Sequence, residues 1–531
     1  MPSQPDPGGA SVTAQPAAVL ICADVARASR VNLAAVEAWF QKTDPHAVVR
    51  VVAGLCEGSG ELDSVLLRDG AERAVLGLCG DGYDERELQS QLRQAGIDPL
   101  TASAVRLGRW CAGLPPEAAT EKAKVMLAAA VAAARASGGS TVANAKPYFP
   151  ARGSRRSFLR FPVPAYRVGP SVDGSRCAAS AGCSLCVEAC PFGALSVADG
   201  RIELDKDCCE GCGRCVSACP REAFHFPGYN PQEVEARVRA LLDPEVSAIQ
   251  PRGILFVCAG ASPPPFLEAG WMPVELPCAA MAPAHWLLAP LLLGAVAVGV
   301  VPCERQGSRG CGPAVLQKVD FCQALLRRAG RPAELVRSHP PADQPPGTEL
   351  PEPVPRADGE VRFHVRPEAV AAVLLRFVRH GGTSSWEHPG CPLGLVEISP
   401  AACTGCGMCA TACPSEALQY GEADGEAWVR FDPARCTACG LCASRCPEQA
   451  RGAIHVSRRL DPESLRAGSR QLLQTPLRRC VACGAPVAPA LMLNRVLELL
   501  GEDGIQLQRV LTQYCPSCRP LWGAREEARR G

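Results

Sequence analysis

Cysteine spacing constrains this chain more than any other feature. Four runs of four cysteines each end in a Cys-Pro step, and three of the runs share the spacing C-x2-C-x2-C-x3-C-P. The first run differs only in its first gap, which holds five residues. Soft thiolates at this spacing bind cubane 4Fe–4S clusters, and four copies argue against zinc or a disulfide framework. The runs are Cys177, Cys183, Cys186 and Cys190; Cys209, Cys212, Cys215 and Cys219; Cys403, Cys406, Cys409 and Cys413; and Cys436, Cys439, Cys442 and Cys446.

The runs form two pairs, and the pairing predicts which thiolates share a cluster. In bacterial ferredoxins, the first three cysteines of such a run bind one cluster and the fourth binds the neighbouring cluster. We therefore expect two ferredoxin-like domains with two 4Fe–4S clusters each. The expected ligand sets are Cys177, Cys183 and Cys186 with Cys219; Cys209, Cys212 and Cys215 with Cys190; Cys403, Cys406 and Cys409 with Cys446; and Cys436, Cys439 and Cys442 with Cys413.

Local sequence predicts short helices and hairpins around these runs. The fourth cysteine of each run is expected at the start of a short helix, with its proline in the first turn. Residues 195–204 should form a hairpin with Asp199-Gly200 at the turn, and residues 420–431 should do the same in the second unit. A small residue three positions after each proline would let the backbone approach the cluster. These residues are Ala194, Ala223, Ala417 and Ala450.

Length and composition favour several small modules. A chain of 531 residues should hold about three or four domains. Aromatic residues make up only 5%, and 50 glycines and 49 prolines are present, so no single large core is expected. Cluster-bearing modules need less core because metal ligation contributes folding free energy. The net charge of +1 argues against binding to nucleic acid.

The sequence also favours a cytoplasmic protein without a membrane span. The first sixteen residues lack the features of a signal peptide, so the 31 cysteines are interpreted as reduced thiolates. Residues 286–301 are apolar, but this stretch contains Pro290, Gly294 and Gly299 and is shorter than the roughly 20 residues of a spanning helix. A buried helix, a glycine turn and a core strand ending at Cys303 are expected instead.

Residues 17–140 alternate between strand and helix patterns. Apolar strand candidates at 18–22, 48–53 and 74–78 are separated by helical stretches such as 33–41, which predicts an α/β domain with a parallel sheet. Three of its four isolated cysteines lie at or just past strand ends, where ligands gather in an open sheet. Four unrelated buried thiols are the alternative. The four are Cys22, Cys56, Cys79 and Cys111.

Short motifs give this domain a family resemblance. They include three of its cysteines and a Thr-Glu-Lys-Ala helix start, and lie at 51–58, 75–79, 96–99, 109–111 and 119–124. Counted from Cys22, about a hundred residues resemble the amino-terminal domain of the A-type polypeptide of heterodisulfide reductase. The resemblance implies that the four cysteines bind an additional iron–sulfur cluster. The family's Cys-x-Cys near the first strand is reduced here to Cys22 alone.

The flavin-binding domain that follows in that family has no counterpart. No glycine-rich dinucleotide fingerprint follows a strand, and no phosphate-binding P-loop motif occurs. Only a basic, proline-rich connection lies between the N-terminal domain and Cys177. The chain is therefore not expected to bind FAD, NAD or ATP on its own.

Residues 251–332 repeat the pattern of strands that run into cysteines. Strands are expected at 254–257, 274–277 and 295–302, followed by a helix at 315–328. This order predicts a second α/β module with a parallel sheet.

The cysteines of this module carry a second resemblance. Cys258, Cys278, Cys303 and Cys311 follow the pattern of the delta subunit of methyl-viologen-reducing hydrogenase. The resemblance implies that they hold a 2Fe–2S cluster. The family's Cys-x-x-Cys after the first strand is missing, and the gap between Cys303 and Cys311 is longer. Cys322, within the expected helix, should be a packed thiol.

Two Cys-x-x-Cys pairs form a further candidate site near the C-terminus. Cys480 and Cys483 precede a helical stretch at 488–500, and Cys515 and Cys518 follow it. Two such pairs suit a tetrahedral, structural zinc ion with no open coordination position. A mononuclear iron or a further cubane is the alternative.

No residue pattern predicts a catalytic site. None of the eight histidines lies in a metalloprotease motif or at the spacing of a Rieske centre. The single Cys-Cys step, Cys208-Cys209, opens a ferredoxin run, so heterodisulfide cleavage is not supported. Cys208 and Cys391 have no assigned role.

These observations predict a multidomain chain with two α/β modules, two ferredoxin-like domains and a small C-terminal metal-knuckle domain. The expected parts are a tail (1–16), the N-terminal domain (17–140), a linker (141–170), the first ferredoxin domain (171–228), a connecting helix (229–250), the hydrogenase-delta-like module (251–332), a proline-rich linker (333–360), a helix (361–390), the second ferredoxin domain (391–458) and the C-terminal module (459–531).

The predicted function is electron transfer in a cytoplasmic oxidoreductase complex. The two resemblances imply assembly with a hydrogenase, a formate dehydrogenase or a heterodisulfide-reductase-like enzyme. One alternative is a self-sufficient oxidoreductase that borrows flavin at a domain boundary. Another is a cluster-based redox sensor, although no element that reads nucleic acid is present.

Overall fold

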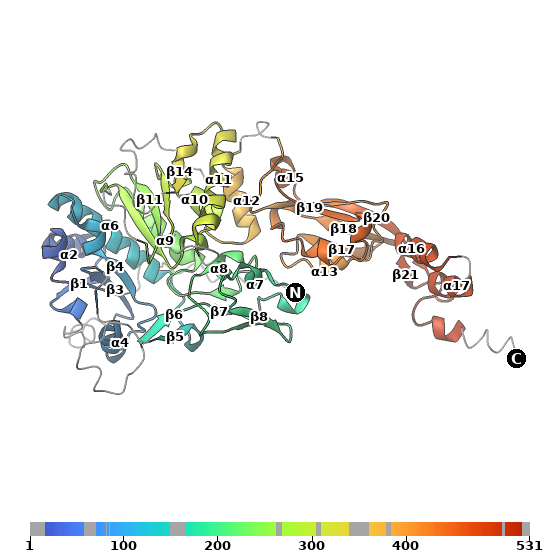
Figure 1. The fold of residues 1–531 in the computed structure, drawn as a ribbon, viewed down its shortest axis with the longest axis horizontal. Coiled ribbons are helices and arrows are strands. Elements are labelled where there is room, and N and C mark those ends of the chain that lie inside the picture. Colours follow the sequence, from blue (N-terminus) through green and yellow to red (C-terminus); the bar gives the residue numbers. More distant parts are fainter. Residues whose placement is uncertain are drawn as a thin grey trace.

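Two α/β modules and a ferredoxin unit form the body of the protein, and the rest of the chain forms a projecting arm. The computed structural model describes residues 16–57, 71–80, 82–83, 85–148, 165–261, 268–303, 310–338, 360–378, 384–501 and 505–522. Most of the expected tail and of the two expected linkers lies outside these residues. Figure 1 shows the two α/β modules side by side, the first ferredoxin unit (green) next to them, and the arm (orange to red) with the second unit and the C-terminal module.

The N-terminal sheet is parallel, with the strand order β2-β1-β3-β4. Its first three strands lie within one residue of the predicted bounds, and β4 is an addition that the sequence pattern does not predict. The central strand β1 is buried along its whole length, as an all-apolar strand between two neighbours should be. The elements are β1 (Ala17–Cys22), α1 (Val25–Ser29), α2 (Leu33–Thr43), β2 (Ala47–Val52), β3 (Arg73–Leu78), α4 (Glu85–Gln94), β4 (Ser103–Arg106), α5 (Leu107–Cys111) and α6 (Pro116–Arg135).

A second parallel sheet, with the order β12-β11-β13-β14, forms the other α/β module. The apolar stretch at 286–301 forms the predicted buried helix, turn and strand, with Gly294 at φ 102° in the turn. The strand ends at Val301, before Cys303. Among the described residues, no helix has both the length and the apolar character to cross a membrane. The elements are β11 (Gly253–Cys258), β12 (Trp271–Leu276), α10 (Ala284–Leu292), β13 (Val298–Val301), α11 (Gly312–Arg328) and β14 (Val336–Ser338).

The two α/β modules are joined at their cysteine-bearing sides. The Glu275 carboxylate on β12 accepts hydrogen bonds from Arg106 at 2.5 Å and from the Trp110 indole at 2.7 Å. Arg109 donates to the carbonyl of Ala261, just beyond β11. The connecting helix α9 (Pro231–Leu241) packs against α6 and adds to the contact.

The first ferredoxin unit contains the predicted hairpin. β8 (Leu195–Ala198) pairs antiparallel with β9 (Arg201–Leu204), and Asp199 and Gly200 have φ values of 48° and 70°. Positive φ at both central positions is the signature of a tight type I′ turn. The remaining elements are β5 (Ala145–Tyr148), β6 (Ala165–Val168), β7 (Ser171–Val172), α7 (Leu185–Ala189), α8 (Arg214–Ala218) and β10 (Phe224–His225).

The short helices of both units correct the prediction. Each helix was expected to begin at the fourth cysteine of its run, but it ends just before that cysteine. For example, α7 ends before Cys190 and α8 ends before Cys219. Both cysteines are extended, with ψ of 108°. A proline disfavours the helical conformation in the residue before it, so the Cys-Pro step must end a helix.

The second unit is enlarged by strands from the C-terminal region. Its predicted hairpin, β17 and β18, is present, but β20 pairs with β18 and β21 with β20, giving a four-stranded sheet. A second sheet has the order β15-β19-β16. The elements are α12 (Pro367–Leu375), β15 (Trp386–Glu387), β16 (Gly394–Ile398), α13 (Met408–Thr411), β17 (Leu418–Ala423), β18 (Glu426–Phe431), α14 (Leu441–Ser444), β19 (Ile454–Leu460), α15 (Pro462–Ala467), β20 (Arg470–Arg479), β21 (Pro486–Pro489), α16 (Ala490–Leu500) and α17 (Ile505–Gln513).

Candidate metal centres

The first ferredoxin unit gathers eight cysteines around two cavities. In each cavity, the first three cysteines of one run meet the fourth cysteine of the other. The structure thus brings together the sets that the spacing predicts. One cavity is lined by Cys177, Cys183, Cys186 and Cys219, and the other by Cys190, Cys209, Cys212 and Cys215.

Backbone amides point at the sulfur atoms in this unit. The amide of Ala194 lies 3.4 Å from Cys190 Sγ, and the amide of Ala223 lies 3.4 Å from Cys219 Sγ. Both alanines are buried, so the small side chain lets the backbone reach the sulfur. Such donors favour the thiolate form that an iron ligand requires. In the last run, Ala450 is exposed and does not repeat this arrangement.

The second unit shows the same crossing of runs in its electrostatics. Burial raises the pKa of Cys409 to about 12, and charges on Cys403, Cys406 and Cys446 add to the shift. Cys446 therefore lies with the first three cysteines of the other run. Partly buried thiols packed this closely repel one another when ionised, so a cation between them would favour their thiolate forms.

The reciprocal set behaves alike. Burial raises the pKa of Cys436 to about 12, and charges on Cys413 and Cys439 raise it further. Cys442 also responds to Cys413. Cys413 is thus grouped with the cysteines of the other run, and the donor chemistry of both sets suits a cubane of iron and sulfide.

The four ferredoxin sites and the second α/β module follow one another in a row. For each pair of adjacent sites, burial raises the pKa of a thiol in one site, and the charge on a cysteine of the other site raises that pKa further. The two cysteines of such a pair are therefore near each other. The row runs from the α/β module through both ferredoxin units. The neighbouring partners are Cys278 with Cys212, Cys186 with Cys215, Cys183 with Cys439, and Cys409 with Cys442.

Direct contacts hold the two ferredoxin units against each other. The guanidinium of Arg221 donates to the Pro414 carbonyl at 3.5 Å and pairs with Glu416 at 3.5 Å. Pro414 also lines the cavity of the first unit that holds Cys219. A Cβ added at Gly182 would lie 2.8 Å from Arg445 Nη2, so the backbone of one unit touches the other.

The second α/β module brings its cysteines together at one end of the sheet. Cys258, Cys278 and Cys311 are buried, with their sulfur atoms within 4.8 Å of one another. Cys303 Sγ lies 3.2 Å from Cys311 Sγ, so all four predicted ligands are in one group of contacts. Hydrogen bonds from Cys258 and Cys311 lower the pKa of Cys278 to about 2. The hydrogen bonds thus favour the thiolate form of Cys278, which is the form that binds a metal.

Cationic side chains surround this site. Lys318 on α11 donates to the carbonyls of Ala280 at 2.5 Å and Ala282 at 2.9 Å. Burial lowers the pKa of Lys318 to about 8, and the charge on Cys278 opposes that shift. Arg214, between Cys212 and Cys215 in sequence, donates to the Gly310 carbonyl at 2.8 Å. Its charge also favours the thiolate of Cys278.

The N-terminal sheet positions three of its four isolated cysteines together. Cys22 ends β1, Cys56 follows β2 and Cys79 follows β3, and their sulfur atoms lie within 4.8 Å of one another. The amide of Cys79 donates to Cys56 Sγ at 3.3 Å. Burial raises the pKa of Cys56. Parallel strands end at one edge, which is why residues distant in sequence meet there.

Cys111, the fourth predicted ligand, is beside this group but outside it. It ends α5 and is fully buried. A Cβ on Gly108 would lie 1.5 Å from the carbonyl oxygen of Cys79, so α5 rests on the Cys79 backbone.

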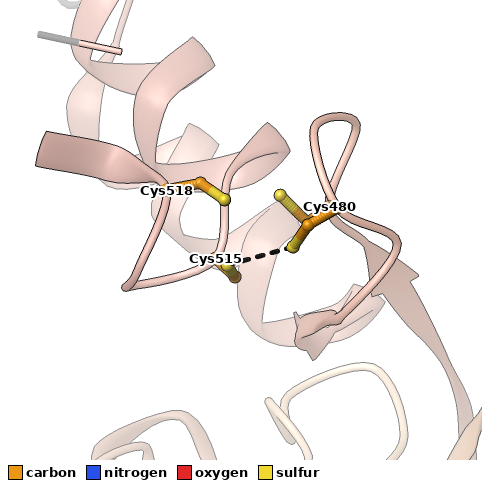
Figure 2. A group of neighbouring side chains, drawn as sticks. Cys480, Cys515 and Cys518 are labelled. Carbon is orange, nitrogen blue, oxygen red and sulfur yellow. Dashed lines mark hydrogen bonds between the residues drawn. The ribbon is translucent and has the colours of Figure 1, made fainter. Parts of the chain in front are cut away.

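The C-terminal cysteines form a compact group of four. Cys480, Cys483, Cys515 and Cys518 have sulfur atoms within 4.8 Å of one another, and Cys483 and Cys515 are 3.6 Å apart. Figure 2 shows Cys480 in one loop facing Cys515 and Cys518 in another. The backbone amide of Cys515 lowers the pKa of Cys480 to about 6. Four thiols converging from two loops match a closed tetrahedral site.

One feature of the structure has no counterpart in the sequence predictions. A cleft of about 640 Å³ lies between the first ferredoxin unit, the second α/β module and the second ferredoxin unit. Its lining includes Arg214, Lys318 and Arg458, the otherwise unassigned Cys391, and Cys439 of a ferredoxin site. No sequence signal could indicate it, because its walls come from segments far apart in the chain.

Comparison with known families identifies part of the chain. Residues 402–450 match the family described as 4Fe-4S dicluster domain, and residues 202–225 match the 4Fe-4S binding domain. The first of these covers both cysteine runs of the second unit, and the second covers the run from Cys209 to Cys219. No curated protein matches the chain. The protein therefore contains two ferredoxin-type iron–sulfur domains, and its cysteine sites indicate a role in electron transfer.

Proposed function

We propose that the protein is an electron-transfer subunit that relays single electrons between the partner subunits of an oxidoreductase complex. The row of neighbouring cysteine sites, from Cys278 to Cys446, carries this proposal. Iron–sulfur centres in such a row accept and pass on one electron each. The protein's own contribution is to hold the sites next to one another and to shield them from water.

The donor atoms suit a different centre at each type of site. The four ferredoxin sites would each hold a 4Fe–4S cluster on the sets described above. Cys258, Cys278, Cys303 and Cys311 would hold a 2Fe–2S cluster, because four thiolates suffice for it. The N-terminal cysteines would bind a further iron–sulfur cluster, for which three sulfur atoms are already grouped.

The C-terminal group is the proposed zinc site. Its cysteines lie on two loops that flank α16, so a bound ion would tie together the end of the arm. Four protein ligands leave no open position, which makes the role structural.

The proposed partners are a hydrogenase, a formate dehydrogenase or a heterodisulfide-reductase-like enzyme in the cytoplasm. The hydrogenase-delta-like module would be the docking end, because its cysteines lie at one end of the row. Electrons would enter near Cys278 and reach the first ferredoxin unit through the site of Cys212.

Electron delivery from a partner tests the proposal. Dithionite or reduced ferredoxin should reduce the isolated protein, which should then reduce a viologen dye. Cys278→Ser should abolish reduction through the partner enzyme, while dithionite still reduces both ferredoxin units. Cys322→Ser is the matched control, since Cys322 is buried in the same module outside the cysteine group. Oxidation of NAD(P)H by the flavin-free protein would contradict the proposal, because one-electron clusters accept no hydride.

A second candidate function, an oxidoreductase that borrows flavin, is favoured by the central cleft. The cleft is large enough for a cofactor, and Arg214, Lys318 and Arg458 would attract its phosphate. It also reaches Cys439, so a flavin there would adjoin the row of clusters. Fluorescence titration with flavin mononucleotide separates the two functions: saturable binding weakened by Arg458→Gln supports the oxidoreductase, and no binding supports the relay alone.

A further inference from the structure

A buried lysine in the N-terminal domain has no charge to balance it among the described protein groups. Lys122 on α6 is 0% exposed, and its Nζ makes no hydrogen bond to any described residue. A buried ammonium without a partner is strongly disfavoured in an apolar environment. Such a residue is expected only where an anion normally lies beside it.

Helix α5, which ends at the fully buried Cys111, packs against α6, the helix that carries Lys122. Burial raises the pKa of Cys111 to about 11, and the charge of Lys122 opposes this shift. Burial lowers the pKa of Lys122, and Cys111 opposes that shift in turn. The packing of α5 on α6 thus places this buried thiol on the helix next to that of the buried cation.

Cys111 connects Lys122 to the cysteine group of the same domain. Helix α5, which carries Cys111, rests on the backbone of Cys79 through Gly108. Cys79 in turn is grouped with Cys22 and Cys56. The buried cation therefore lies on a helix that packs against α5 and against β1 and β3, the strands that lead to Cys22 and Cys79.

We propose that Lys122 is the built-in counter-charge of an anionic iron–thiolate centre held by Cys22, Cys56, Cys79 and Cys111. The proposal rests on the N-terminal cluster of the proposed function and adds the residue that sets its reduction potential. Reduction adds one electron and no bond to the centre, so its negative charge grows. A buried cation at Lys122 favours the more negative, reduced state, and raises the potential.

Lys124 provides a matched comparison on the same helix. It pairs with Glu121 at 2.6 Å, so its charge is already balanced. Substitution of Lys124 by Met therefore removes one positive charge from α6 without removing the counter-charge of the cysteine site.

The test is an anaerobic redox titration of the full-length protein, followed by electron paramagnetic resonance. The N-terminal signal is identified as the one lost in Cys22→Ser. Lys122→Met should lower the midpoint potential of this signal by at least about 59 mV, which is a tenfold change in the equilibrium constant for one electron. Lys122→Arg, which keeps the charge, and Lys124→Met should each shift it by less than half as much. Equal shifts in Lys122→Met and Lys124→Met would overturn the proposal.

A second measurement separates charge compensation from a purely structural role. In the Cys22→Ser background, Lys122→Met should raise the melting temperature, because it replaces an unpaired buried ammonium with an apolar side chain. A lowered melting temperature there would overturn the proposal. Unchanged iron content in Cys22→Ser would also overturn it, by showing that no N-terminal cluster exists, but would leave the ferredoxin relay intact.

Discussion

The two ferredoxin units carry the same type of cysteine run but differ in how they pack against the rest of the protein. The first unit shares one hydrophobic core with both α/β modules, and Cys186, Cys215 and Phe224 belong to that core. The second unit has a small core of its own, built around Val429 and Phe431, and Cys436 and Cys442 belong to it. One unit is thus supported by its neighbours, while the other depends mainly on its own hairpin and ligands.

This difference shows how a cluster module can be adapted to its place in a chain. Embedded in the body, the first unit has its hairpin β8–β9 as a two-stranded sheet without added strands. In the arm, β20 and β21 widen the corresponding sheet and lead directly to the C-terminal cysteines. The added strands supply backbone hydrogen bonds where apolar burial is scarce.

Removal of iron should separate the two regions most strongly. Anaerobically purified protein should contain at least roughly sixteen iron atoms for four cubanes. Oxidative destruction and chelation should then unfold the second unit, because ligation provides much of its folding free energy. The first unit should keep more of its protection, because it shares the larger core with the α/β modules. Hydrogen exchange followed by mass spectrometry measures both regions at once, and equal loss of protection in the two would contradict the comparison.

Much of the fold follows from local sequence. The first three strands of the N-terminal sheet, the helix and strand at 286–301 and both tight hairpins are encoded in apolar runs and Asp-Gly turns. The cysteine sets of the ferredoxin units follow from spacing, because a cubane fixes the distances between its ligands. The position of the short helices was predicted wrongly, since the effect of proline on Cys190 and Cys219 outweighs its preference for a first helical turn.

The remaining features depend on contacts between distant segments. Strand β20 joins the sheet of β18 across some forty residues, and no periodicity in either strand encodes that pairing. The order of the cluster sites depends on contacts such as that of Arg221 with Pro414. Cys111 resembles a ligand in sequence, yet α5 leaves it just outside the group of three.

Crossed ligation can be tested within the less supported unit. Cys446→Ala should damage the cluster of Cys403, Cys406 and Cys409, because Cys446 lies with that set. Loss of one cubane, about four iron atoms, is expected with spectroscopic changes in that cluster. Spectroscopic loss confined to the cluster of Cys436, Cys439 and Cys442 would show that the crossing is wrong.

The contact between the two regions can be weakened with a smaller effect. Gly182→Trp should push the units apart, because a side chain there meets Arg445. Gly193→Trp is the control, since Gly193 also has positive φ but nothing within 4 Å of an added Cβ. Both variants should bind full iron. Freeze-quenched spectra should show slower electron transfer into the second unit only for Gly182→Trp, and equal rates in both variants would argue against this junction.

The smallest expected effect is a pH-dependent attachment where the chain leaves the body for the arm. Glu222, which precedes Ala223 in the first ferredoxin unit, accepts hydrogen bonds from His364 at 2.8 Å and from the Val365 amide at 2.9 Å. The hydrogen bond to Glu222 raises the pKa of His364. Burial opposes the shift of Glu222, but the hydrogen bond and charge of His364 lower its pKa.

The directions of these shifts define where the attachment is strongest. The contribution of His364 is fully present below the ordinary histidine pKa of about 6.5 and is lost as the pH rises through the raised value. That of Glu222 is present above about 4.3 and is lost as the pH falls through the lowered value. Because the His364 side chain is 40% exposed, solvent screening should limit the effect to about 1 kcal/mol or less. Hydrogen exchange at residues 360–366, corrected for intrinsic rates, should be slowest between about pH 4.3 and pH 6.5. In His364→Gln, the exchange rate should no longer change with pH above about 6.5. The exposed His455 supplies the control: if His455→Gln abolishes the dependence equally, the assignment to His364 is wrong.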